Sequence, residues 1–179
     1  RMILLLRSVF PHGGWRSCWA DLRRCPGLPS STAVAAFKDA AYTIGVALWP
    51  SGVQVSYGHP GVTQLDDIVA FMDVSASQEP ATFGTNRSRE ETLELKVMFS
   101  CFRAGGPDME KVAFDRAIEL QGQLETAFRV TDTTTGGSVR ECFLTDIRVS
   151  SATDEQTLSK GRLVEIEATY TAKARVKTA

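Results

Sequence analysis

The chain has 179 residues, of which 43% are hydrophobic and 23% charged, and its formal net charge at pH 7 is -1. This length fits one domain with an appendage, and the composition is that of an ordinary globular protein. The near-neutral charge argues against a chain built mainly to bind nucleic acid or an anionic membrane, because both need a strong positive field. The apolar run at residues 2–6 is too short to span a bilayer, so we expect no membrane partner.

Residues 1–30 differ in composition from the rest of the chain. They carry five arginines against one acidic residue, Asp21, and no hydrophobic period of 2 or 3.6 runs through them. We interpret them as a basic, irregular N-terminal arm with at most a short strand at Met2–Leu6. The alternative is a disordered start; the functional interpretation is an arm that lies across a neighbouring subunit. Residues 31–179 are then a single, mildly acidic domain.

From Ser31 onward the hydrophobic pattern is regular. Apolar residues recur three or four apart, which predicts a helix from Val34 that Ser31 or Thr32 caps and Trp49-Pro50 ends. Alternating patterns then predict strands at 52–57, 67–78, 91–102, 139–150 and 162–176, with a second helix at 108–129 capped by Asp108. The segments 82–89, 131–138 and 151–160 are expected to be loops.

This order of elements predicts an α+β fold. No helical pattern separates the last two strands, so we expect an antiparallel or mixed sheet of about four to five strands with two helices packed on one face. An unbroken alternation in the strand 139–150 would put Phe143, Ile147 and Val149 on one face. The cysteines are interpreted as small buried hydrophobic residues, since Cys18 and Cys25 lack zinc spacing and Cys101 and Cys142 stand in strand patterns.

The last strand is about fifteen residues long, well beyond the usual five or six, and one of its faces is charged or hydroxylated throughout. A strand that outruns a compact core usually extends into a hairpin or is covered by another copy, because an open edge invites aggregation. An assembled ring is one solution, and a long curved sheet in a monomer is the other.

We expect no catalytic centre, no metal and no cofactor. The histidines, His12 and His59, have no partners at ligand spacing. The turn at 105–108 lacks the phosphate-binding pattern of glycines and lysine. The adjacent acids Asp66-Asp67 and Glu90-Glu91 are interpreted as solvated strand ends, because neighbouring residues in a strand point opposite ways.

Charged residues on the long strands are the candidate interface with other subunits or partners. Arg87, Arg89 and Arg103 are expected to approach one another at one end of the strand 91–102, as a modest basic patch for an acidic partner surface or passing DNA. The candidate interface set is completed by Glu90 and by the charged face of the last strand, which holds Glu165, Glu167 and Lys173.

The chain from about residue 31 to 176 resembles a known family. The helix STAVAAFKDAAYTIGVAL leads into PSGVQVSYGHPG and DDIVAFMDV, and RSREETLELKVMFSCFRAG, DMEKVAFDRAIELQGQLETAFR and two closing strands follow. This order is similar to the lambda-like tail terminator (tail-completion, neck-ring) proteins of long-tailed phages and prophages. The pattern E-x-x-x-L-x-V-x-x-x-x-x-R-x-G, from Glu91 to Gly105, carries the resemblance best.

The resemblance implies a structural virion protein that is neither an enzyme nor in need of a cofactor. It would form a hexameric ring that caps the completed tail tube and joins it to the head-closure or connector protein. Genomic DNA would pass through the lumen without sequence-specific contact. Such a protein is assembled in the host cytoplasm and resides in the tail–neck region of the virion.

Two groups of alternatives stay open. Another head–tail connector, a head-closure protein or a tail tube subunit is the nearest, although a tube subunit should carry a longer hairpin than the short segment 78–90 suggests. A nucleic-acid-binding α+β module that uses the sheet face and the arm belongs to a different class, and so does a small enzyme.

Overall fold

The computed structural model of the chain describes residues 32–61, 65–81, 88–151 and 155–176. The expected N-terminal arm and residues 82–87 of the expected loop 82–89 lie outside these ranges. The elements in chain order are α1 (Val34–Leu48), β1 (Gln54–Tyr57), β2 (Asp67–Pro80), β3 (Arg89–Ala104), α2 (Met109–Thr126), the π-helical turn η1 (Ala127–Thr131), β4 (Glu141–Ser151), α3 (Glu155–Lys160) and β5 (Gly161–Val176).

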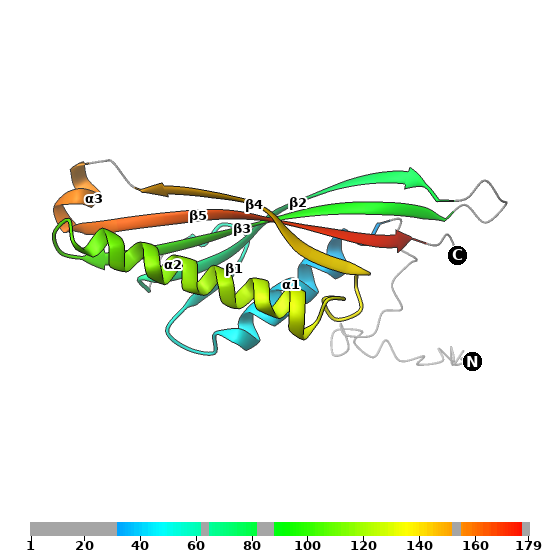
Figure 1. Cartoon of the computed structure of the whole chain (residues 1–179), viewed down its shortest axis with the longest axis horizontal. Coiled ribbons are helices and arrows are strands. Elements are labelled where there is room, and N and C mark those ends of the chain that lie inside the picture. The colour runs from blue at the N-terminus through cyan, green and yellow to red at the C-terminus, as the bar shows by residue number, and fades with distance from the viewer. Residues whose placement is uncertain (1–31, 62–64, 82–87, 152–154, 177–179) are drawn as a thin grey trace, which may run out of the picture. The chain divides into compact units, whose positions relative to one another are not determined.

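The strands form one five-stranded sheet in the order β1-β2-β3-β5-β4. β1 pairs with β2 in parallel, and all other neighbours are antiparallel, so the sheet is mixed. Both long helices lie along the same face of the sheet, with α2 on β3 and β5 and α1 on β1 and β2 (Figure 1). The structure therefore confirms the predicted α+β fold, its number of strands and its two helices on one face.

The hydrophobic core lies between this sheet face and the helices. The alternation seen in the sequence of β3 places Leu93, Leu95, Val97, Phe99 and Cys101 in it, all without exposed surface. Leu120 and Leu124 of α2 and Phe37 of α1 cover them from the other layer. Each buried leucine or phenylalanine contributes roughly 1.5–3 kcal/mol relative to an exposed one, so this layer contact dominates the stability of the domain.

Gly45 allows α1 to approach the sheet closely. A Cβ atom at this position would lie 2.6 Å from Cζ of Phe71 on β2, well inside the contact distance of two carbon atoms. Helix α1 therefore needs glycine, the smallest residue, at the point where it crosses the ring of Phe71.

Three local expectations were wrong. Residues 155–160, expected as loop, form the short helix α3. Asp108 precedes α2 as predicted, but its side chain makes no capping hydrogen bond. β4 shifts register between Leu144 and Asp146, so Ile147 pairs with the buried Ala168. This bulge turns Ile147 and Val149 toward the helix side while Phe143, before it, faces the other side.

Candidate assembly interface

The sheet face opposite the helices, here called the outer face, is polar and lined with ion pairs. Along β5, Glu167 pairs with Lys96 of β3 at 3.0 Å, and Lys173 pairs with Glu141 of β4 at 3.1 Å. Glu165 accepts a hydrogen bond from Ser100 at 3.5 Å. The long charged face predicted for the last strand is thus present. Its charges are mostly neutralised by cross-strand partners, and each exposed pair adds at most about 1 kcal/mol to stability.

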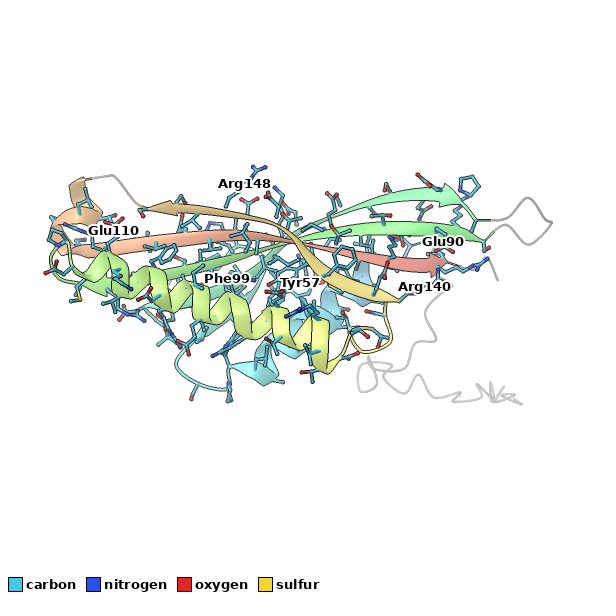
Figure 2. The ribbon with its side chains drawn as sticks, in the orientation of Figure 1. Tyr57, Glu90, Phe99, Glu110, Arg140 and Arg148 are labelled. Carbon is cyan, nitrogen blue, oxygen red and sulfur yellow. The ribbon has the colours of Figure 1, made fainter. Side chains whose placement is uncertain are left out.

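A second charged cluster lies at the hairpin end of the sheet. Glu90 accepts from Arg140 at 3.0 Å and lies 3.6 Å from the guanidinium of Arg175 (Figure 2). Arg89 donates to the side chain of Gln78 across the β2–β3 hairpin at 2.9 Å. Arg87 lies outside the described residues. Arg89 and Glu90 are therefore held by side chains of neighbouring strands and segments instead of forming a free basic patch.

Arg103 does not join the other predicted arginines. Arg89 and Arg103 stand at opposite ends of β3, which at about 3.3 Å per residue separates them by about 46 Å. The Arg103 guanidinium instead lies 2.6 Å from Asp67, whose other carboxylate oxygen lies 2.8 Å from Nε of Arg116 on α2. The predicted basic patch is thus wrong, because the strand that carries these residues is too long to bring its ends together.

Asp67 was expected to be a solvated strand end and is instead only 7% exposed. Burial alone would raise its pKa, but hydrogen bonds and charge from Arg103 and Arg116 outweigh burial and hold the pKa below the ordinary value. This cluster ties α2 to β2 and β3. It is a structural element, and it leaves none of the three groups free for chemistry.

Glu91 was also expected to be solvated and is 1% exposed. Its carboxylate accepts from the Ala33 amide at 2.7 Å and from the Thr32 hydroxyl at the start of α1, and also from Gln78 at 2.9 Å. These three donors outweigh the effect of burial and lower the pKa of Glu91. A carboxylate from β3 thus caps the helix. Thr32, the predicted cap, supplies a longer bond, accepting from the Val34 amide at 3.3 Å.

A cavity of about 710 Å³ opens on the outer face beside α3. Its lining combines apolar side chains, among them Met98, Phe102 and Leu163, with the polar groups of Ser100, Glu165 and His59. Ring nitrogen Nδ1 of His59 accepts from the Gly61 amide at 3.3 Å. Cys101 faces the helix layer on the other side of the sheet, where burial first and the charge of Asp67 second raise its pKa to about 12. No thiolate–imidazole pair is assembled from Cys101 and His59.

Within the described ranges, no group of three or more histidine, cysteine or acidic side chains is arranged to hold a metal ion. No described helix is both long and apolar enough to cross a membrane.

The two edges of the sheet are open to different extents. Among the described residues, β1 covers β2 only from Ile68 to Phe71, so the rest of β2 up to Pro80 is an edge of the described sheet. β4 is the edge strand on the other side, and no strand in the part of the chain that the structure describes pairs with its outer edge. Sequence patterns could not show which strand would be outermost, because they do not report strand order.

Known proteins offer little further guidance. No family model matches the chain, and no curated protein matches it. A solved structure described as the virion of a native gene transfer agent particle is similar with a TM-score of 0.43 and 14% sequence identity, covering 83% of this chain and 100% of that chain. Similarity at this level does not define a function. The fold and the interface residues define the class as an α+β domain with an open-edged sheet and a polar, ion-paired outer face.

Proposed function

We propose that this protein is a structural virion protein of a long-tailed phage, a tail terminator whose copies form a ring at the end of the tail tube. The observation that carries the proposal is the sheet itself: strands of up to 16 residues with an edge on each side that no strand of the described residues pairs with. Two different open edges on one subunit suit a head-to-tail contact between copies, and such a contact closes into a ring when its rotation allows.

The outer face of the sheet suits the wall of a channel for DNA. Its charged side chains are paired with one another, as in Glu167–Lys96 and Lys173–Glu141, so the face carries no strong positive field. A positive face would hold the phosphate backbone by releasing counterions, and DNA would then stick instead of passing. In the proposed ring, this face lines the lumen, where DNA passes without sequence-specific contact.

The remaining parts of the proposal follow from the family resemblance. The ring is a hexamer that contacts the tail tube protein on one side and the head-closure or connector protein on the other. It is assembled in the host cytoplasm and resides in the tail–neck region. The protein is not an enzyme and uses no cofactor; the burial of Cys101 and the engagement of Asp67 with two arginines support that view.

A tail tube subunit is the second candidate, and one observation favours it. The β2–β3 hairpin is longer than the sequence suggested, since β2 runs to Pro80 and β3 begins at Arg89, with twelve residue pairs between the strands. A projecting hairpin of this kind suits stacking of one ring on the next. A tube subunit would polymerise into long stacks, whereas a terminator would stop at a single ring.

Light scattering and negative-stain microscopy of the purified protein test the proposal. We expect a single mass several times that of the 19.5 kDa chain and single rings in the images. Long tubes in the images would favour a tail tube subunit over a tail terminator. A stable monomer that also fails to bind tail tubes would overturn both, and binding to DNA with a steep salt dependence would favour the nucleic-acid-binding alternative.

A matched pair of variants on β4 sharpens the test. Ile147 and Phe143 are equally exposed, at 39%, but the bulge points them to opposite sides of the sheet. We expect Ile147→Lys to lower the assembled mass, because it puts a charge among the apolar side chains beside the open edge. Phe143→Lys, on the outer face, should leave the mass unchanged.

A further inference from the structure

The cavity beside α3 crosses three strands of the outer face. Its floor follows the register of the sheet, in which Ile68 of β2 pairs with Ser100 of β3, and Ser100 pairs with Glu165 of β5. The segment after β1 that carries His59 and the helix α3 complete the lining. α3 lies at the end of the sheet opposite the β2–β3 hairpin (Figure 1), so the cavity belongs to that end. Its volume of about 710 Å³ is that of a binding site for a small molecule or a short peptide segment.

The carboxylates of Asp66 and Glu165 line this cavity without a cationic partner. The ion pairs of the outer face use other acidic residues. Among the described residues, neither carboxylate forms an ion pair, and Glu165 accepts a hydrogen bond only from Ser100, at 3.5 Å. Lys160 is the one lysine or arginine among the described lining residues, and it is exposed and paired with neither carboxylate. The cavity therefore presents a net negative charge to an occupant.

Apolar side chains lie between the two carboxylates. The Phe102 amide donates to the Asp66 carbonyl, and Phe102 pairs with Leu163 on its other side. Met98, on the same face of β3, extends this apolar surface toward the middle of the sheet. Its flexible thioether side chain can adapt to the shape of an occupant. The cavity thus combines an apolar centre with a negative charge on each side of it.

The distance between the two acidic residues suits an extended peptide. Asp66 lies opposite Phe102, whereas Glu165 lies two strands away and two residues further along the sheet. With strands about 4.8 Å apart and a rise of about 3.3 Å per residue, the Cα atoms of Asp66 and Glu165 are about 12 Å apart. In an extended peptide, residues i and i+4 point to the same side at a separation of about 13 Å, and residue i+2 points to that side midway between them. Basic residues at i and i+4 can therefore reach the two carboxylates while residue i+2 meets the apolar centre.

We propose that this cavity binds an extended segment of a partner protein with the pattern basic–x–apolar–x–basic. The two basic side chains pair with Asp66 and Glu165, and the apolar side chain packs on Phe102 and Met98. Charge complementarity selects such a segment over DNA, because the carboxylates repel phosphate groups. The inference goes beyond the proposed function. It concerns a single subunit and does not depend on the ring.

A peptide titration of the full-length chain tests the inference. The probe is the peptide acetyl-Arg-Ala-Leu-Ala-Arg-amide, and the readout is the NMR signal of isotope-labelled methionine methyl groups. Met98 lines the cavity, whereas Met72 and Met109 do not and serve as internal references. We expect the Met98 signal to shift in a saturable manner while the signals of Met72 and Met109 stay in place.

Charge-neutralising variants show whether the carboxylates select the peptide. Asp66→Asn and Glu165→Gln should each raise the dissociation constant of the peptide by about fivefold, the upper range for an exposed ion pair. Glu94→Gln is the matched control, because Glu94 is an exposed acidic residue on the same face of β3 and lies outside the cavity. It should leave the dissociation constant unchanged.

Two further peptides test the spacing and the sign of the charge. Acetyl-Arg-Arg-Ala-Ala-Leu-amide has the same composition without the spacing and should bind more weakly, and acetyl-Glu-Ala-Leu-Ala-Glu-amide should not bind. Equal affinity for the first of these peptides, or a Met98 shift with the second, would overturn the inference. It would also be overturned if Met98 showed no shift at millimolar probe, or if Glu94→Gln weakened binding as much as Glu165→Gln.

Discussion

The clearest test of the structure is the substitution Asp67→Asn, which removes the charge that Arg103 and Arg116 share. Removing one partner of a buried ion pair typically lowers the free energy of unfolding by roughly 3–5 kcal/mol, because the remaining charge is left buried without a partner. Here the arginine side chains keep 25% and 29% of their surface exposed, so water compensates part of the loss. We therefore expect a loss of about 2–3 kcal/mol in the free energy of unfolding at pH 7.

Urea unfolding followed by circular dichroism measures this loss. At about 1–3 kcal/mol per molar urea, the midpoint should fall by on the order of 1–2 M. Asp66→Asn is the matched control, because Asp66 is exposed and its carboxylate forms no ion pair with the described part of the chain. A midpoint that moves no more for Asp67→Asn than for Asp66→Asn would refute the reasoning.

The stability difference between wild type and Asp67→Asn should also depend on pH. Because the folded-state pKa of Asp67 is lowered, its stabilisation is fully present above the unfolded pKa of about 3.9 and is lost as pH falls toward the folded value. The stability difference between wild type and Asp67→Asn should thus shrink below about pH 4. A difference that stays constant from pH 7 to pH 3 would show that it does not arise from the charge.

Three further substitutions probe other parts of the fold. Glu91→Gln should cost about 1–3 kcal/mol in urea unfolding, because the neutral amide replaces a buried carboxylate that caps α1; an unchanged midpoint would contradict this. Gly45→Ala should cost about 1–3 kcal/mol, since the new methyl group would meet the ring of Phe71, and a gain in thermal stability would show that the ring can move aside. Tyr170→Phe should leave stability unchanged or raise it by about 1 kcal/mol, because the buried hydroxyl forms no well-aligned hydrogen bond among the described residues and interacts only weakly with Gln121; a loss above that size in calorimetry would show that the contact with Gln121 is a full hydrogen bond.

Local periodicity explains what could be predicted about the core. The alternation of β3 and the three-to-four spacing in α1 follow from which side of each element is buried, so they predict elements, faces and fold class. The same reasoning missed the bulge in β4, because Phe143, Ile147 and Val149 alternate without interruption in the sequence. Only pairing with β5 shows that the alternation changes sides.

The candidate interface was predicted in part for a similar reason. Glu165, Glu167 and Lys173 lie on one face of one strand, so their common position followed from the alternation alone. Arg89 and Arg103 lie on one strand as well, but their distance depends on strand length, which local pattern predicts poorly. Arg103 also binds Asp67, and Asp67 in turn binds Arg116, which lies 49 positions further along the chain. No spacing rule predicts such a contact.

The sequence by itself determined the α+β class, the order of the long helices and strands, and the charged face of the last strand, because each depends on neighbours two to four residues apart. The tertiary structure alone decided the environment of the acidic pairs. Asp67 and Glu91 look like their neighbours in the sequence, and they are buried where donors from β2, β3, α2 and the residues just before α1 converge on them. It also decided which strands are edges, since strand order arises from pairing across the whole sheet and leaves no local signal in the chain.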